Sequence, residues 1–360
     1  MGGVDGGDYW RYWDDAPVVD WDDRIVLGSG AFSEWSDRRP AGPMRLRALL
    51  IGHSHDLDLA RIATLLQDAG TAVEVLLVDR VGHQPTVEFP TSAPPARYDV
   101  GYCRGFRPAQ VVHYHFDRTL RRASDWRAID PALEGHVVGQ VNALLWSWLR
   151  RVTVSRWVNS PWDLREAENK LIQLAAAEHV GLTIPATLVT DRTESVRRFS
   201  EKHAAGIVHK SLDSPVIALG DGKGRFLYTA AVEPDHLGEL TFPGLFQQRL
   251  LPRREHRVTV IGNRRFVASL HRTPTQQPDW RRDAAEHHRF EHHALDDVLI
   301  DAIGELMATL GVQVGAVDLL ETDDQIYFLE LNPSAALTWL ERTLGMQLCQ
   351  TVTNLILCGR

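Results

Sequence analysis

The sequence has few cysteines and few lysines, and it has no long hydrophobic run. Its three cysteines, Cys103, Cys349 and Cys358, are odd in number and lack the spacing of metal ligands, so we expect reduced structural thiols. No stretch approaches about 18 uncharged apolar residues, which excludes a membrane-spanning segment. The N-terminal residues MGGVDGGDYW lack the basic and apolar regions of a secretory signal. We therefore expect a cytoplasmic protein.

Basic residues are fewer than acidic residues. Lysines and arginines number 39 against 47 acidic residues, giving a formal net charge of −8. This balance argues against a general nucleic-acid-binding protein. The 360 residues are 44% hydrophobic, which is too long and too apolar a chain for a disordered or fibrous protein. The length predicts two or three domains with well-formed cores.

Residues 1–43 differ from the rest of the chain. They hold nine acidic residues and four arginines, together with four of the eleven tryptophans, and no helical or strand periodicity runs through them. Two interpretations stay open for this acidic, Trp-rich N-terminal extension. It is either a flexible tail that lies partly on the body of the protein, or a docking or lid segment that folds on a surface.

The first folded part covers residues 44–158. Residues 46–51 and 72–78 predict two apolar strands, and the apolar spacing between them predicts a helix that ends near Gly70. This β-α-β unit lacks the G-x-G-x-x-G fingerprint of dinucleotide-binding proteins. A further long helix is expected around residues 132–150.

The remaining chain divides into a central lobe, residues 159–245, and a C-terminal lobe, residues 246–360. Ser160 and Pro161 predict a helix start, and the apolar face behind them predicts one continuous helix through residues 164–178. A second capped helix is expected at residues 191–194, and short strands follow from residue 206. Helices near 296–310 and 345–357 flank two strands. The pattern is α/β followed by α+β lobes.

The segment VGAVDLLETDDQIYFLELNPS, residues 314–334, carries the strongest chemical signal. Two apolar strands flank a polar turn at residues 322–324, and the alternation of side chains places Asp318, Glu330 and Asn332 on one face. Two carboxylates and an amide oxygen would repel one another unless a cation lay between them. They are the hard oxygen ligands that suit Mg²⁺. The sequence therefore predicts a magnesium site on this hairpin.

Magnesium held by two carboxylates suggests a nucleotide, whose phosphates need cations nearby. The chain has only four lysines, and Lys210 ends the apolar strand GIVHK, where a surface lysine is not expected. The turn LGDGKGR, residues 219–225, could fold over phosphates as a flap. Arg257, Arg272 and Arg281 lie in or just after strands that face this region. They would stabilise charge on a transferring phosphoryl group, or they pair with the many acids.

At this point the chain resembles the ATP-grasp superfamily, and more narrowly the ATP-grasp ribosomal peptide maturases, the microviridin-type or graspetide macrocyclases. Five blocks occur in the family's order and carry the resemblance, which is strong from residue 159 onward. They are NSPWDLREAENKLIQLAAAEHVGLTIPATLVT, IVHK, LFQQRLLPRREHRVTVIGNRRFVASLHR, PDWRR and VGAVDLLETDDQIYFLELNPSAALTWLE. The resemblance implies an ATP-grasp fold, with a pre-ATP-grasp β-α-β domain followed by two lobes that clasp ATP.

The resemblance also implies roles by position. Lys170 and Lys210 match the nucleotide-binding lysines, and the stretch Gln247, Gln248, Arg249 and Leu250 matches an interlobe hinge that binds adenine mainly through its backbone. Two further blocks, residues 255–257 and 279–281, match an acid-x-Arg block beside the triphosphate and a D-W-R block. The residues concerned are Glu255, Arg257, Asp279, Trp280 and Arg281. Asp318, Glu330 and Asn332 match the magnesium ligands, in agreement with the hairpin argument.

The implied chemistry is ATP-dependent ligation with Mg²⁺. A substrate carboxylate attacks the γ-phosphate of ATP, and a hydroxyl or amine then captures the acyl phosphate as an ester or amide. In the graspetide family the carboxylate is an Asp or Glu side chain of a precursor peptide, and the product is a macrocycle. The expected partner is a precursor peptide with a leader and an acidic core, and the family also suggests a homodimer.

Two other functions stay open from the sequence. One is an ATP-grasp ligase that joins amino acids or modifies a small molecule or a protein terminus. The other is a nucleotide-dependent peptide-binding protein that does not catalyse. The complete set of Asp318, Glu330 and Asn332 argues against the second, because a protein without a reaction has no need of all three. Fold analogy alone would not establish the reaction.

Overall fold

The computed structural model of the chain describes residues 46–53, 56–78, 85, 87, 89, 95–106, 131–212, 216–219, 223–226, 228–272, 278–280 and 289–359. The acidic extension, residues 1–43, and Arg281 lie outside these described residues. Within them no helix has both the length and the apolar character needed to cross a membrane. Cys103 and Cys349 are buried and Cys358 is exposed, and all three are free thiols, as the sequence predicts.

The first part of the chain forms a parallel sheet of strand order β2-β1-β3-β4. Its strands are β1 (Arg47–Gly52), β2 (Ala72–Leu77), β3 (Arg97–Cys103) and β4 (Thr153–Val158), and its helices are α2 (Leu57–Asp68) and α4 (Pro131–Leu149). Leu50 of β1 packs in one core cluster with α2, while Leu49 packs in another with Leu145 of α4. Both faces of the sheet are therefore covered, which explains its continuous apolar strands.

The sequence predicts one helix after Ser160, and this prediction is wrong. The structure has α5 (Pro161–Ala167) and α6 (Lys170–His179), separated at Asn169. Asn169 has an extended backbone, and its side-chain oxygen accepts hydrogen bonds from the backbone N–H groups of Leu171 and Ile172. It thereby starts a new helix, because an Asn at this position can satisfy backbone donors that the end of a helix leaves without partners.

The central lobe is an antiparallel sheet of order β5-β10-β6-β9 with α7 (Thr193–Ser200) packed on it. Its strands are β5 (Thr187–Thr190), β6 (Ile207–Lys210), β9 (Ala230–Val232) and β10 (Gly244–Gln248), with the short helix η3 (Pro234–His236). A separate hairpin, β7 (Val216–Leu219) and β8 (Lys223–Phe226), forms at the predicted flap. The predicted cap at residue 191 is wrong, since Arg192 is the N-cap and makes no side-chain cap bond.

The C-terminal lobe is built on the largest sheet, of order β13-β12-β11-β14-β15. Its strands are β11 (Arg254–Ile261), β12 (Arg264–His271), β13 (Phe290–His292), β14 (Val314–Glu321) and β15 (Ile326–Asn332). Helices α6 and α8 (Asp297–Thr309) cover one face. The other face packs against α10 (Leu348–Cys358) and a helix that the sequence did not predict, α9 (Thr338–Leu344).

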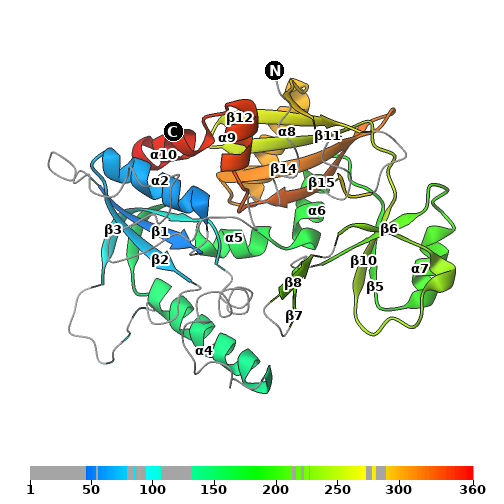
Figure 1. The fold of residues 1–360 in the computed structure, drawn as a ribbon, viewed down its shortest axis with the longest axis horizontal. Coiled ribbons are helices and arrows are strands. Elements are labelled where there is room, and N and C mark those ends of the chain that lie inside the picture. Colours follow the sequence, from blue (N-terminus) through cyan, green and yellow to red (C-terminus); the bar gives the residue numbers. More distant parts are fainter. Residues whose placement is uncertain are drawn as a thin grey trace.

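The first sheet and the C-terminal lobe share one hydrophobic core. Leu50 and Ile62 belong to the same buried cluster as Val314, Leu340 and Ile356. Figure 1 shows α9 and α10 between the blue parallel sheet and the large yellow-to-orange sheet, with the central lobe standing apart on the right. The central lobe has its own small core around Val196, Ile207 and Phe246. The division at residues 43, 158 and 245 stays a prediction.

Candidate functional site

The hairpin of β14 and β15 brings the predicted magnesium ligands together. Asp318 pairs directly with Glu330 across the two strands, and an irregularity follows between Asp318 and Leu319. Asn332, two residues further on, donates from its Nδ2 to Asp318 Oδ2 at 2.8 Å and to Glu330 Oε1 at 3.5 Å. The three side chains therefore lie on one face, as side-chain alternation requires. Their role as metal ligands stays a prediction.

Each of the two carboxylates faces a cation. Arg257, the partner of Asp318 on β11, donates from Nη1 to the two Asp318 oxygens at 2.9 and 3.2 Å. Lys170, the first residue of α6, places its Nζ 3.8 Å from Glu330 Oε2 and donates to the carbonyl of Ser211 at 2.7 Å. These contacts offset the repulsion between the carboxylates. The site thus combines two acids, an amide, an arginine and a lysine.

Lys210 extends the site from the central lobe. It is the last residue of β6 and is partly buried. Burial lowers the pKa of Lys210, the nearby Glu330 raises it, and Lys170 lowers it again. Glu255 and Asp279 also act on it, so this lysine faces the same group of charges as the hairpin. A cation that is partly desolvated in this way is suited to binding an anion, because an anion would restore the lost stabilisation of its charge.

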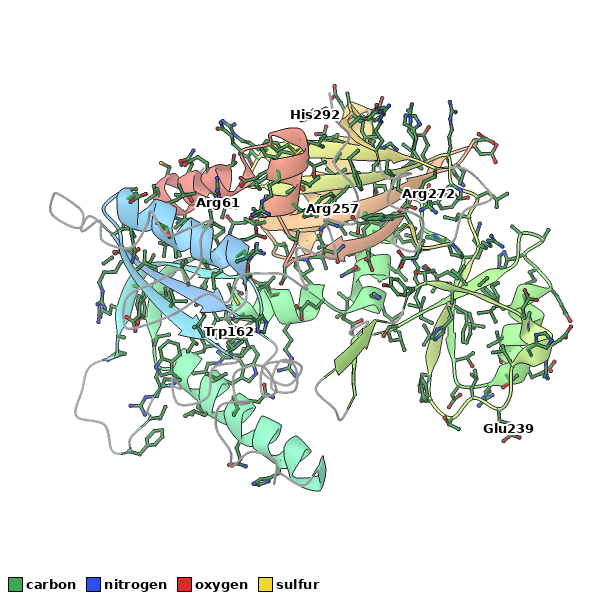
Figure 2. All side chains as sticks on the ribbon, in the orientation of Figure 1. Arg61, Trp162, Glu239, Arg257, Arg272 and His292 are labelled. Carbon is green, nitrogen blue, oxygen red and sulfur yellow. The ribbon has the colours of Figure 1, made fainter. Side chains whose placement is uncertain are left out.

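Glu255 and Arg272 form a second, deeper pair. Glu255 lies two residues before Arg257 on β11, and the Nη1 of Arg272 donates to its Oε1. The Arg272 side chain is almost fully buried, and its backbone N–H donates to the carbonyl of Arg253 at 3.0 Å. Figure 2 marks Arg257 and Arg272 on the large sheet. In this arrangement Arg272 holds Glu255, whereas Arg257 contacts the hairpin itself.

The predicted hinge lies at the end of β10. The Gln247 side chain is buried and donates to Thr187 Oγ1 at 2.9 Å, and Gln248 accepts a hydrogen bond from the N–H of Ala186 at 3.0 Å. Both amides are thus used within the central lobe, and Leu250 follows them in a partly buried position. The backbone N–H groups of Gln248 and Arg249 are paired as well, with the carbonyls of Ala186 and Gly206 at 2.9 Å each, and the binding of a base by this segment stays a prediction.

The D-W-R block is described only in part, since Arg281 lies outside the described residues. Asp279 is buried and accepts a hydrogen bond from the N–H of Thr229 in the central lobe at 3.4 Å. Trp280 packs edge-on against Phe290, with ring centroids 5.4 Å apart, and Phe290 packs in the same way on Trp339. The block therefore connects the two lobes beside Lys210.

Gln173 is a site residue that the sequence analysis missed. It is buried on α6, one turn after Lys170, and it binds both backbone groups of Leu331, the residue between Glu330 and Asn332. Its Nε2 donates to the Leu331 carbonyl at 2.8 Å, and its Oε1 accepts the Leu331 N–H at 2.8 Å. Because β15 is an edge strand, the amide replaces a neighbouring strand there. A polar residue between Ile172 and Leu174 on a helix gave no signal of this role.

The donor set fits a hard, oxygen-seeking cation, since it offers four carboxylate oxygens and an amide group on one face. Among the described residues, no group of three or more His, Cys, Asp or Glu side chains has the arrangement of a metal site. The predicted set is of a smaller kind, with two carboxylates and one amide. Such a set suits Mg²⁺, which keeps several waters and phosphate oxygens in its coordination sphere.

Comparison with known proteins identifies the fold. Residues 245–356 match the family model of the RimK-like ATP-grasp domain. The chain has an ATP-grasp fold. No curated protein sequence matches it.

Three solved structures show how far the likeness extends. The macrocyclase MdnC bound with precursor peptide MdnA, from Microcystis aeruginosa MRC, is 21% identical with a TM-score of 0.71, covering 87% of this chain and 100% of MdnC. The Chryseobacterium gregarium RiPP-associated ATP-grasp ligase, in complex with ADP and a leader and core peptide, is 21% identical with a TM-score of 0.67, covering 88% and 98%. The ligase PsnB, with minimal precursor, Mg and ADP, is 20% identical with a TM-score of 0.62, covering 86% and 96%.

The likeness extends over nearly the whole of these ATP-grasp proteins. The chain thus resembles the ATP-grasp maturases of ribosomal peptides over 86–88% of its length, as its sequence motifs indicate. At identities this low the structural likeness establishes the fold, and the reaction has to be argued from the site.

Proposed function

We propose that this chain is an ATP- and Mg²⁺-dependent ligase that activates an Asp or Glu side chain of a precursor peptide and closes it into an ω-ester or ω-amide macrocycle. The observation that carries the proposal is the convergence of Asp318, Glu330 and Asn332 with Lys170 and Lys210 in an ATP-grasp fold. The precursor, leader and core peptides bound in the similar structures support a peptide substrate.

The residues of this chain divide into those that hold the metal and those that hold phosphate. Asp318, Glu330 and Asn332 would bind Mg²⁺, which neutralises phosphate charge during the transfer. Lys170 on α6, which packs on the large sheet, and Lys210 on β6 of the sheet β5-β10-β6-β9 would bind phosphate oxygens from two sides, so that closure of that sheet over the site excludes water from the reactive acyl phosphate. The backbone near Gln248 and Leu250 would bind the base.

Charge stabilisation is the task we assign to the arginines. Arg257 is placed to leave Asp318 for a phosphate oxygen once a cation takes its position on the carboxylate. Arg272 keeps Glu255 in place, and Arg281 would add a further positive charge. No nucleophile of the protein takes part. One carboxylate oxygen of the substrate bonds to the γ-phosphorus as ADP leaves, and a hydroxyl or amine then bonds to the acyl carbon as phosphate leaves.

The test is mass spectrometry of small acidic peptides encoded beside the gene, after incubation with the protein, ATP and Mg²⁺. Loss of the mass of one water molecule per linkage, without an added amine, is the expected result. A gain equal to an amino acid less water, seen only with a free amine present, would instead mean a ligase that joins two molecules. Nucleotide binding with no change in any peptide would favour a non-catalytic binding protein.

A further inference from the structure

Asp58, at the second position of α2, is a buried carboxylate outside the candidate site. The residue is 1% exposed, and it accepts hydrogen bonds from four donors. The backbone N–H groups of Leu337 and Thr338 donate to it at 2.7 and 2.9 Å, as does the Thr338 hydroxyl. The fourth donor is Nη2 of Arg104, at 2.9 Å. Asp58 of the first domain thus binds residues 337 and 338, which lie almost 280 residues later in the chain.

The segment that Asp58 holds is the start of α9. Leu337 is the N-cap of that helix and makes no side-chain cap bond. Helix N-terminal N–H groups need an acceptor, and a negative charge near them is favourable. Asp58 supplies both from another domain. Asp58 of α2 therefore supplies the cap that the sequence of α9 lacks.

Arg104, which follows β3, holds the same segment at a second point. Its Nη2 donates to the carbonyl of Ala335 at 3.1 Å, and its Nε donates to Asp56 Oδ2 at 2.7 Å. Although burial by itself lowers the pKa of Arg104, the carboxylates of Asp56 and Asp58 raise it well above its ordinary value. The guanidinium therefore stays charged and keeps Asp58 paired.

The held segment begins directly after a predicted magnesium ligand. Residues 333–338 follow Asn332 without any intervening element, and Asn159, which directly follows β4, also donates to the carbonyls of Pro333 and Val314, at 3.4 and 2.6 Å. Any shift of this short segment would be passed to Asn332, whose amide contacts Asp318 and Glu330. The metal-binding strand is thus held at its end by the first domain.

We propose that Asp58, with Arg104, is a positioning residue that sets the magnesium ligand Asn332 from the pre-ATP-grasp domain. The proposal rests on the proposed function, since it assumes that the hairpin binds Mg²⁺ with nucleotide. A buried ion pair is a weak source of stability, because apolar residues of similar size would cost less to bury. Its value here is the fixed geometry that it imposes on residues 333–338. Outer-shell residues of this kind commonly change metal affinity by about 10–100-fold when replaced.

The test is the affinity of the full-length protein for ADP, measured by calorimetry with and without Mg²⁺. In Asp58→Asn one carboxylate oxygen becomes an N–H₂ group that faces donors, so residues 337 and 338 are held less firmly. Mg²⁺ should strengthen ADP binding by a factor that is about tenfold or more smaller in Asp58→Asn than in the unchanged protein. The affinity for ADP in the absence of Mg²⁺ should be the same in both proteins. A purely structural role would weaken both measurements together.

Three further variants complete the design. Arg61→Gln is the matched control, because it breaks another contact between α2 and α9, the Arg61–Glu341 pair at 3.2 Å, without touching residues 333–338. Thr338→Val removes one donor to Asp58 while keeping the side-chain shape, so it tests the proposal even if Asp58→Asn fails to fold. Thr338→Val should reduce the factor by which Mg²⁺ strengthens ADP binding, but by less than Asp58→Asn does. Thr338→Ser keeps the hydroxyl donor and should leave this factor unchanged.

The outcomes separate this proposal from the proposed function. If Mg²⁺ does not strengthen ADP binding in the unchanged protein, the magnesium site itself is refuted. If Mg²⁺ strengthens ADP binding equally in the unchanged protein, Asp58→Asn and Thr338→Val, the positioning role is overturned while the proposed function stands. If Arg61→Gln weakens the effect of Mg²⁺ on ADP binding as much as Asp58→Asn does, the positioning role is also overturned. Breaking any contact between α2 and α9 would then have the same effect.

Discussion

At the residue scale, the candidate site is a set of charges that hold one another in place. Asp318 contacts Arg257, Glu330 faces Lys170, and Asn332 joins the two carboxylates. Alternation along two strands was enough to predict that the acids and the amide share a face. Their cationic partners could not be paired from the sequence, because Arg257 and Lys170 come from elements that only the folded sheet brings near. The same limit hid Gln173 and Asp58, whose partners are backbone groups of distant residues.

Glu330→Gln tests the metal assignment at this scale. The change keeps the size of the side chain and removes its charge, so the hairpin should fold while Mg²⁺ binds weakly. Because the metal supplies several kcal/mol of charge stabilisation, we expect turnover to fall by at least about a hundredfold. Turnover at several Mg²⁺ concentrations, with circular dichroism as a check of folding, measures this. Glu239→Gln, an exposed position on the central lobe, is the control (Figure 2). Unchanged turnover in Glu330→Gln would refute the assignment.

His256 predicts a pH dependence of stability. It lies on the other face of β11, with Nδ1 2.7 Å from Ser269 Oγ and Nε2 3.0 Å from Glu321 Oε2, and its ring stacks on His293. Burial lowers the pKa of His256 below its ordinary value of 6.5, although Glu321 acts in the opposite direction. As the pH falls through the ordinary value, the unfolded chain takes up a proton that the folded chain does not. Stability must therefore fall with pH in this range.

Chemical unfolding at about pH 7.5 and about pH 5.5 checks this, comparing the unchanged protein with His256→Asn. The unchanged protein should lose more unfolding free energy between the two conditions, by at most about 1.4 kcal/mol per pH unit for one proton. Equal losses in the two proteins would mean that His256 does not contribute.

At the element scale, the strands and most helices could be predicted, and their ends could not. Gly70 and Gly311 mark helix ends with positive φ, as their positions in the sequence indicate. Asn169, in contrast, looks like part of a continuous amphipathic helix, and only its extended backbone reveals a new start. Helix α9 has no cap of its own, so its sequence gives no start signal. Its cap is Asp58, which lies in another domain.

Gln173→Leu tests how α6 is fixed to the edge strand β15. Leucine has a similar size, but it leaves the N–H and C=O of Leu331 without their partner. Burying unsatisfied polar groups costs about 1–3 kcal/mol each, so we expect a clear loss of unfolding free energy. The affinity for Mg²⁺ with ADP should fall as well, since Glu330 and Asn332 flank Leu331. Chemical unfolding and calorimetry measure the two effects. Gln350→Leu, an exposed glutamine on α10, is the control. If Gln173→Leu is as stable as this control, the contact of Gln173 with the backbone of Leu331 does not hold α6 on β15.

At the scale of the whole molecule, the first sheet and the C-terminal lobe are joined to each other by a shared core, whereas the central lobe has a core of its own. The first sheet and the C-terminal lobe share a core, and Asp58, Arg104 and Asn159 add buried polar bonds between them. The sheet β5-β10-β6-β9 has its own small core, and it meets the rest of the protein through contacts such as Lys170 with Ser211 and Asp279 with Thr229. The order of motifs along the chain predicted this ATP-grasp architecture. The shared core could not be predicted, because it joins residues from opposite ends of the chain.

Amide hydrogen exchange can test whether bound nucleotide connects the central lobe to the rest of the protein. Nucleotide bound between Lys210 and Glu330 would connect the central lobe to the C-terminal lobe. We therefore expect ADP with Mg²⁺ to slow exchange in β6 and β9 far more than in β1 and β3, whose core is already fixed. Glu330→Gln under the same conditions should show little of this protection. Equal protection of both sheets, or none in the central lobe, would contradict the arrangement.

The proposed function requires that this site converts a peptide carboxylate to an acyl phosphate. The most direct measurement uses a peptide substrate whose Asp and Glu side-chain carboxylates carry the heavy oxygen isotope, with mass spectrometry of the phosphate released. Our account predicts one heavy oxygen atom in each phosphate, because the carboxylate oxygen that attacks phosphorus leaves with it when the ester or amide forms. Unlabelled phosphate, or label in AMP, would contradict the account.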